Sequence, residues 1–528
     1  MPAGLNGWFR DPLAILCLVS ALLAFVVQSG ELGTSDTAHR MQTTHWLWTS
    51  QPQVFPNEYP EFGLHGRNGR LYSWYGIGQS LLLLPADLVG TAVSRLPIFS
   101  GYEDDPSIRS IFVSYSTNIL LNVLTVLVAF RLLRQLRFSV TESVFGVLAL
   151  LFCTTHLHYT QNMMENNYIM LLTLTGFAFQ HDWLRTGSRR ALFVGSAALG
   201  LNLLTRLTTG LDLIAAGGFL LLVLLFERVS LHDLGSRVLA YLTIAAPVYA
   251  LFLLIDRAYN FYRFESFTTT YVANFAREFR LNDPTLPANF PWSTPFHIGF
   301  FGALFKPEKS IFLFDPLLVL AIALLVSLWK RLSPELRAYA IASLLLLLAY
   351  ISFYARYTFW AGDFAWGDRY VSTTVELVAL IAVPLLLHGR ASLSRWAWRA
   401  AIMLIAASLI IQLASLAFWH PLEIYQMETL SHPTVVIALR FKNIAAFALG
   451  KMDVWGLNNE SMTYDPWDYV HITCWNFLPF LLKRVGVAPP WVVKTTLAFW
   501  YSGIAALVWS LLRLRNAIDI DTPEALSS

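Results

Sequence analysis

The sequence predicts an all-α polytopic membrane protein with about twelve transmembrane helices and with shorter helices and loops on the outer face. Two features of the composition support this class, because 56% of the 528 residues are hydrophobic and only 13% are charged. A soluble protein of this length carries roughly twice that charged fraction. In addition, apolar runs of bilayer-spanning length recur along the whole chain. This pattern excludes a soluble multi-domain protein.

About 20 apolar residues are needed to cross the hydrocarbon core of a bilayer. Candidate spans centre on residues 12–29, 110–130, 142–157, 164–181, 191–205, 208–226, 238–256, 310–329, 338–355, 371–387, 399–419 and 491–512. The first of them follows Arg10 and resembles a signal peptide. No convincing small-residue cleavage site follows it, so we expect an uncleaved first span.

One further apolar run, Leu81–Leu96, is interrupted by Pro85, Asp87 and Gly90. If this run does not cross, the short basic loops all face the cytoplasm, as the positive-inside rule requires. Those loops carry Arg131, Arg134, Arg137, Arg185, Arg189, Arg190, Arg228, Arg237, Lys330, Arg331, Arg337, Arg390, Arg395, Arg399, Arg513 and Arg515. We therefore expect an interfacial or re-entrant helix at 81–96 and two cytoplasmic termini.

We expect one catalytic core over residues 1–420, an outer-face loop region without an assigned role over 421–490, and a last span with a cytoplasmic tail over 491–528. The net charge of +3 and the lack of a basic-aromatic stripe argue against a nucleic-acid partner. The apolar spans make membrane lipids the expected surroundings. The cysteines, at positions 17, 153 and 474, offer no evident disulfide pair or metal cluster. The sequence requires no cofactor and leaves a divalent metal open.

Two carboxylates lie at the expected outer boundary of the bilayer. Asp36 follows the first span, where a general base could activate an acceptor hydroxyl, although Ser35 or Asp36 could instead cap the next helix. Glu165 opens the span 164–181, and an acid at such a junction is costly to leave unpaired. An interfacial Glu165 in contact with water is the alternative.

Cations and polar side chains share these outer segments. Arg70, Arg206, Lys306 and Arg369 are candidate ligands of a lipid phosphate, and each alone could instead be a headgroup contact. Nearby candidates for substrate contact are Tyr72, Tyr75, His158 and Asp368. The pair His156 and His158 is spaced poorly for a metal site on a helix.

The order of several short motifs resembles the GT-C membrane glycosyltransferases, in particular the bacterial branch related to protein O-mannosyltransferases and the lipid A aminoarabinose transferase. The similar elements are Ser35-Asp36-Thr37, Gly69 to Pro85, Met164-Glu165-Asn166, Leu204-Thr205-Arg206, Gly302 to Pro316 and Trp360 to Tyr370. The resemblance covers most of residues 1–390.

This resemblance implies transfer of a single sugar from a polyprenyl-phosphate donor to a glycan, lipid or protein hydroxyl on the periplasmic face of a bacterial inner membrane. Asp36 and Glu165 would then be catalytic, in an inverting displacement, and Arg206, Arg369, Lys306 and Arg70 would bind the donor phosphate. A glycan polymerase or ligase shares this architecture. A flippase is a more distant alternative, because transporters place polar groups at mid-bilayer.

Overall fold

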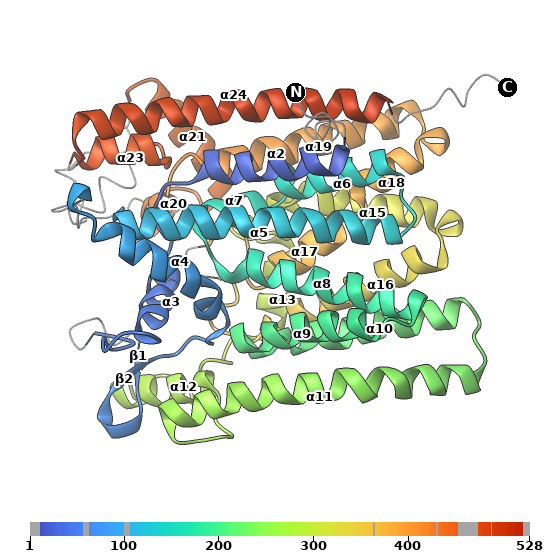
Figure 1. Ribbon diagram of the computed structural model, residues 1–528, viewed down its shortest axis with the longest axis horizontal. Coiled ribbons are helices and arrows are strands. Elements are labelled where there is room, and N and C mark those ends of the chain that lie inside the picture. The colour runs from blue at the N-terminus through green and yellow to red at the C-terminus, as the bar shows by residue number, and fades with distance from the viewer. Residues whose placement is uncertain are drawn as a thin grey trace.

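The computed structural model describes residues 11–55, 63–99, 106–362, 365–419, 421–428, 431–451, 474–486 and 488–520. Its long helices lie side by side, and α2 begins at the same end of this bundle at which α24 ends (Figure 1). The bundle contains α2 (Pro12–Val27), α5 (Ile108–Gln135), α6 (Val140–Cys153), α7 (His156–Asn162), α8 (Glu165–Thr186), α9 (Arg189–Thr205), α10 (Gly210–Phe226), α11 (Leu231–Phe264), α14 (Ile311–Phe314), α15 (Pro316–Leu328), α16 (Pro334–Tyr354), α17 (Ser372–Ala379), α18 (Ala382–His388), α19 (Arg395–Ser415) and α24 (Pro490–Ile520). Every predicted span falls on one of these helices or on a broken pair, which confirms the all-α class.

Several of these helices can cross a membrane. In the part of the chain that the structure describes, six helices are long and apolar enough, and the bent pair of α6 and α7 would make a seventh. The six lie in α5, α10, α11, α16, α19 and α24, whereas α2 and the pair of α17 and α18 are apolar but shorter. The chain is therefore an integral membrane protein, and the number of about twelve spans stays a prediction.

Three predicted spans are broken rather than continuous. α15 starts at Pro316, because proline lacks the N–H that a helix interior needs but is suited to the first helical position. Pro384 likewise leaves the carbonyl of Leu380 without a helical donor, and Leu380 lies where α17 gives way to α18. α6 and α7 meet at an extended residue, Thr154, with a bend of 55° between them.

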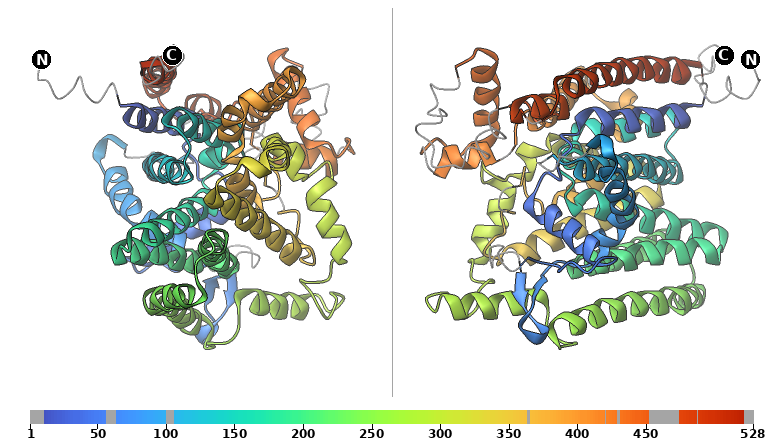
Figure 2. Two further views of the ribbon diagram at one scale, coloured as in Figure 1. Left: turned by 90° about the vertical axis from the view of Figure 1, so that its right-hand side faces the viewer. Right: turned by 60° about the vertical axis from the view of Figure 1, so that its left-hand side comes forward.

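One end of the bundle carries short additional elements, and we call it the site end. They are α3 (Ser35–Trp46), the antiparallel strands β1 (Gly63–His65) and β2 (Leu71–Ser73), α4 (Gly78–Ser94) and α12 (Tyr271–Asn282) (Figure 1). Figure 2 shows the two blue strands beside α11 and α12. α4 contains most of the run 81–96 that was predicted to lie outside the spans, and it packs on α3 and α5.

Asp87 of α4 fixes the arrangement of these elements. Its carboxylate is fully buried and accepts hydrogen bonds from Trp48 Nε1 (2.8 Å) and Arg109 Nε (2.6 Å). His45 Nδ1 lies 3.0 Å from the same carboxylate. Since His45 lies in the last turn of α3 and Arg109 in the first turn of α5, one acid connects three helices at the site end.

The short basic loops gather at the opposite end of the bundle. There Glu335 accepts from Arg137 (2.6 Å) and Arg185 (2.8 Å), and Arg185 also pairs with Glu227 (2.6 Å). These contacts join the ends of α5, α8, α10 and α16. The basic segments that were predicted to share one side of the membrane therefore share one end of the molecule.

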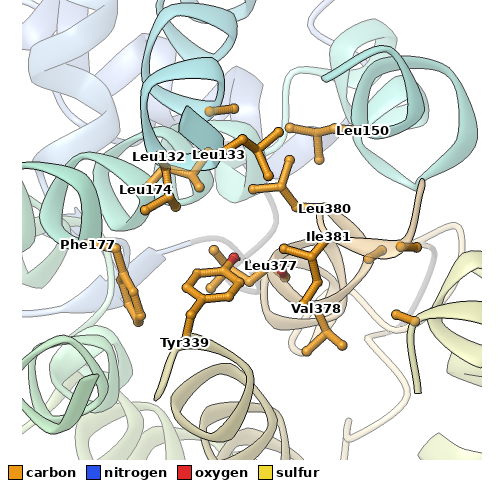
Figure 3. Close-up of a cluster of buried hydrophobic side chains, with 14 of the residues drawn as sticks. Leu132, Leu133, Leu150, Leu174, Phe177, Tyr339, Leu377, Val378, Leu380 and Ile381 are labelled. Carbon is orange, nitrogen blue, oxygen red and sulfur yellow. Dashed lines mark hydrogen bonds between the residues drawn. The ribbon is translucent and has the colours of Figure 1, made fainter. Parts of the chain in front are cut away.

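An apolar core lies between the two ends. Side chains from α5, α6, α8, α16 and α17 meet there, as shown for Leu132, Leu150, Phe177, Tyr339 and Leu377 (Figure 3). The Tyr339 hydroxyl donates to the carbonyl of Leu377 (2.7 Å), so this polar atom is satisfied. The packed core holds the helices that present charged groups at the site end.

Candidate active site at one end of the bundle

Asp36 lies in the first turn of α3. The cap of this helix is Thr34, whose hydroxyl accepts from the backbone N–H of Thr37 (3.3 Å). Neither Ser35 nor Asp36 caps the helix, so the capping alternative considered for these residues is wrong. The carboxylate of Asp36 is available for other contacts.

Two donors hold that carboxylate. The Tyr75 hydroxyl donates to Oδ1 of Asp36 (2.7 Å), and Arg369 Nη1 donates to Oδ2 (2.7 Å). Burial alone would raise the pKa of Asp36, but Arg369 and Arg40 outweigh that effect and bring the pKa below its ordinary value of 3.8. Asp36 is therefore ionised at neutral pH, with its side chain 16% exposed.

Glu165, the first residue of α8, lies between two arginines. Its Oε2 is 2.7 Å from Arg40 Nη1, and its Oε1 accepts a hydrogen bond from Arg206. Glu165 is only 1% exposed, so the alternative of an interfacial glutamate in contact with water is wrong. A buried carboxylate requires such paired cations to remain charged.

Arg40 is a member of this site that the sequence reasoning missed. It is 4% exposed, and its guanidinium lies 4.2 Å from the centre of the Tyr75 ring. Its Nε makes no hydrogen bond within the described residues. Asp36 and Arg40 are four residues apart on α3 and so share a helix face, which is the pattern that could have identified Arg40.

The backbone segment that carries Arg369 is held in place by Lys309 and Asn166. Lys309 Nζ donates to the carbonyls of Ala365 (2.7 Å) and Gly367 (3.2 Å), and Asn166 Nδ2 donates to the carbonyl of Arg369 (2.6 Å). Residues 363 and 364 of this segment lie outside the described residues. Lys309 is buried, so its hydrogen bonds to these carbonyls hold the segment against the interior of the protein.

Asp368 and His158 support the same segment. The Asp368 carboxylate accepts from the backbone N–H of Tyr370 (3.0 Å), and burial raises its pKa to about 7. The buried His158 ring stacks on Trp366 at 5.8 Å between ring centres. Asp368 is therefore part of the segment that carries Arg369, and His158 packs against it.

Arg206 is the C-cap of α9 and has an extended backbone conformation. Its guanidinium lies 5.2 Å from the centre of the Tyr370 ring, and that of Arg369 lies 5.3 Å from the same ring. Two cations therefore flank one aromatic side chain. We call Asp36, Arg40, Glu165, Arg206 and Arg369 the ion-pair cluster.

A cavity of about 540 Å³, which we call the first cavity, adjoins the cluster at Arg206. Its volume is within the usual range for small-molecule sites. Most of its wall is aromatic or aliphatic, with contributions from Tyr271, Phe290, Trp292, Phe353, Tyr354, Tyr357 and Tyr370. The Thr208 and Tyr354 hydroxyls are hydrogen-bonded (2.9 Å) within this wall.

The other predicted cations lie elsewhere. Lys306 pairs with Glu308 (2.7 Å), and its side chain is 50% exposed. Arg70 and Tyr72 line a separate cavity of about 710 Å³, which we call the second cavity. The structure thus brings together Asp36, Tyr75, Glu165, Arg206 and Arg369 out of the predicted site residues.

The fold and this site define a polytopic helical membrane protein with a buried ion-pair cluster beside an aromatic cavity. Over the described ranges, no three His, Cys, Asp or Glu side chains are grouped to hold a metal ion. No protein-family model matches the sequence, and no curated protein matches it either.

Among solved structures, the fold is similar to that of ArnT from Cupriavidus metallidurans bound to undecaprenyl phosphate. The two sequences are 12% identical, the TM-score is 0.40, and the match covers 96% of this chain and 77% of that one. At this identity and TM-score the likeness assigns no role to any residue of this chain.

Proposed function

We propose that this chain is a glycosyltransferase that moves one sugar from a polyprenyl-phosphate donor to an acceptor hydroxyl. The observation that supports this most directly is the contact between the ion-pair cluster and the first cavity at Arg206. A phosphate requires cations, whereas the sugar and prenyl parts of such a donor require aromatic and apolar surface. Arg206 lies where these two environments meet.

We assign the donor phosphate to Arg206 and Arg369. Their guanidiniums lie 5.2 and 5.3 Å from the centre of the Tyr370 ring, and Arg206 and Tyr370 both line the first cavity. Glu165 assists by holding Arg206 and Arg40 in place. Cations held in advance stabilise the charge that grows on a departing phosphate without further reorganisation.

Asp36 is the proposed base. It takes the proton of the acceptor hydroxyl while that oxygen bonds to C1 of the sugar, and the C1–O bond to the phosphate breaks with its electron pair leaving on the phosphate. One displacement of this kind inverts the configuration at C1. Tyr75 fixes the orientation of the base by donating to Oδ1.

Donor binding would also activate this base. In the structure Arg369 neutralises Asp36 and lowers its pKa, which makes the carboxylate a weak proton acceptor. A donor phosphate that attracts Arg369 would leave Oδ2 of Asp36 less stabilised and more basic. This coupling would keep the base inactive until the donor arrives.

The proposed location follows from the basic loops. We place the site end on the periplasmic side of a bacterial inner membrane and both termini in the cytoplasm, because the basic loops lie at the opposite end. In a variant without Cys17, Cys153 and Cys474, a membrane-impermeant thiol reagent should label Thr285→Cys in intact cells and should not label Thr186→Cys. The reverse pattern would contradict this orientation.

A glycan polymerase or ligase remains the closest alternative function, and a flippase is the next. Mass analysis of lipid-linked sugars after deletion of the gene separates them. Accumulated polyprenyl-phosphate monosaccharide supports the proposal, whereas accumulated lipid-linked oligosaccharide supports the polymerase or ligase. Monosaccharide donor confined to the cytoplasmic leaflet would indicate a flippase.

A further inference from the structure

The second cavity has a lining that the proposed donor site does not explain. It is enclosed at the site end by the end of α3, the loop after it, the β1–β2 hairpin and the end of α11. Its wall combines the aromatic rings of Trp46, Tyr72 and Tyr262 with the polar side chains of Thr49 and Gln53. The first cavity has a far more continuous aromatic and aliphatic wall.

Gln53 carries an unsatisfied donor in this wall. It is 2% exposed, and its Oε1 accepts from the backbone N–H of Ser73 (3.2 Å), which fixes the orientation of the amide. The Nε2 group then has no hydrogen-bond partner among the described residues. A buried amide N–H without a partner costs free energy, so a ligand oxygen that came within hydrogen-bonding distance of Nε2 would be stabilising.

The aromatic rings are arranged around one space. Tyr262 lies 5.7 Å from Trp46 and 6.0 Å from Tyr72 between ring centres, and the Tyr72 contact is edge to face. Rings in this arrangement offer apolar surface together with polar edges. A sugar ring has the complementary surface, because its C–H groups pack on aromatic faces while its hydroxyls bind amides and hydroxyls.

We propose that the second cavity is a binding site for the carbohydrate part of the acceptor. The proposal deepens the function proposed above. It rests on that function only in taking the bound carbohydrate to be part of the acceptor. A lipid chain would require a continuous apolar wall, which Thr49 and Gln53 interrupt. The aromatic and amide lining suits a polyhydroxylated ligand.

Two elements connect this cavity to Asp36. Asp36 lies near the start of α3 and Trp46 is its last residue, so at 1.5 Å per residue they are about 15 Å apart along the helix. β2 presents Tyr72 to the cavity, and Tyr75 follows three residues later to hold Asp36. Arg263 fixes the chain between them by donating to the carbonyls of Ser73 and Tyr75.

This separation sets the size of the acceptor. A single sugar ring in the second cavity would not reach the carboxylate at the other end of α3. The acceptor should therefore be an oligosaccharide, or a glycan on a larger carrier, whose distal rings occupy the second cavity while the reacting hydroxyl meets Asp36.

A glycan array tests the proposal on the full-length protein in a sugar-free zwitterionic detergent, since maltoside detergents would compete. The array carries neutral and acidic oligosaccharides of defined sequence, together with peptide and phospholipid spots. Wild-type protein should bind at least one oligosaccharide, and Trp46→Ala and Gln53→Glu should each weaken that binding about tenfold or more. Gln53→Glu keeps an oxygen that can accept from Ser73 and replaces the donor amide group with a second carboxyl oxygen.

Trp396→Ala is the matched control, because Trp396 is 76% exposed on α19 and should leave binding unchanged. Should Gln53→Glu fail to fold, the half-buried Trp46 still provides the test. Absence of oligosaccharide binding by wild type, binding only to peptide or lipid spots, or unchanged binding in the variants would overturn the proposal. Donor turnover is assayed separately. Glycan binding without turnover would contradict the proposed transferase function but not the proposed binding site.

Discussion

Two buried groups of arginines and carboxylates differ in how completely their atoms are paired. In the C-terminal region, α20 (Pro421–Glu428) and α21 (Val436–Ala448) place Arg440 against Glu423 with two N–O contacts of 2.7 Å each. Arg440 is fully buried and also donates to the carbonyls of Ser415 (2.9 Å) and Phe418 (2.8 Å). Asn443 donates to Glu423 as well (2.9 Å). These bonds leave little capacity for a ligand.

The ion-pair cluster differs from this C-terminal group because it is incompletely hydrogen-bonded and because it borders a cavity. Arg40 keeps an Nε without a hydrogen-bond partner in the described part of the chain, and Arg206 borders the first cavity. A saturated pair can support a fold, whereas an incompletely bonded pair beside a cavity can exchange partners with a ligand. The difference indicates which buried charges to test for chemistry and which to test for stability.

The two groups are nevertheless connected. The Arg440 guanidinium lies 5.1 Å from the centre of the Trp366 ring, and Trp366 precedes Arg369 by three residues. The region 421–490, which had no predicted role, thus supports the segment that carries a site arginine, although residues 452–473 lie outside the described residues. Substitutions in the ion-pair cluster should therefore lower activity, whereas substitutions around Arg440 should lower stability.

The largest expected effect concerns Asp36. Asp36→Asn keeps an oxygen that can accept from Tyr75 but removes the proton acceptor, so the rate of sugar transfer should fall by roughly 10²–10⁴. The measurement is single-turnover transfer by purified protein whose folding and donor binding match wild type. Transfer at a near wild-type rate would show that Asp36 is not the base.

Glu423→Gln should act on stability instead. It leaves Arg440 buried with no opposite charge, which should lower the free energy of unfolding by about 3–5 kcal/mol. The exposed pair of Glu265 and Arg67 (3.4 Å) provides the control, since Glu265→Gln should cost less than about 1 kcal/mol. Thermal unfolding in detergent measures both variants, and equal losses would remove the contrast.

Arg206→Gln should weaken donor binding. Removal of one partner of a desolvated charge contact typically costs about 2–5 kcal/mol, so the KM for the donor should rise at least about tenfold. Arg277→Gln is the matched control, because Arg277 is an exposed arginine on α12 at the same end. An unchanged KM in Arg206→Gln would remove the phosphate assignment.

The smallest effect, counted per pH unit, is on the pH dependence of stability. With a pKa raised to about 7, folded Asp368 holds a proton that the unfolded chain releases near its ordinary value of 3.8. Stability should therefore fall as the pH rises from 4 to 7, by less than about 1.4 kcal/mol per pH unit. Asp368→Asn should remove this slope, so its stability relative to wild type should be greater at pH 8 than at pH 5. An equal difference at both pH values would contradict the prediction.

Hydropathy and sidedness predicted much of the fold, because helices in a bilayer must satisfy their own backbone and present apolar side chains. The same reasoning could not show that three spans are broken, since Thr154, Pro316 and Pro384 all lie within the apolar runs that predicted those spans. Glu165 was predicted because an acid at a span junction is costly to leave unpaired, and Asp36 because it follows the first span, where a base could meet an acceptor hydroxyl.

Their partners were harder to predict. Arg40 lies among polar residues that look like an exposed helix face, and Asp36 and Arg369 are 333 residues apart. No local pattern encodes such a contact, because tertiary packing alone brings the two residues together. Arg70 illustrates the converse, since it was a candidate ligand of the lipid phosphate but the fold places it at the second cavity.

The hydrogen bonds of Asp87 have a consequence for how the protein is made. His45, Trp48, Asp87 and Arg109 all lie within the first 110 residues, so the part that carries Asp36 and Arg40 can assemble while the ribosome is still translating the rest. Arg369 emerges some 260 residues after Arg109. The contacts of Asp87 that join α3 to α4 and α5 can therefore form before Arg369 is synthesised, whereas the ion pair of Asp36 with Arg369 can form only afterwards.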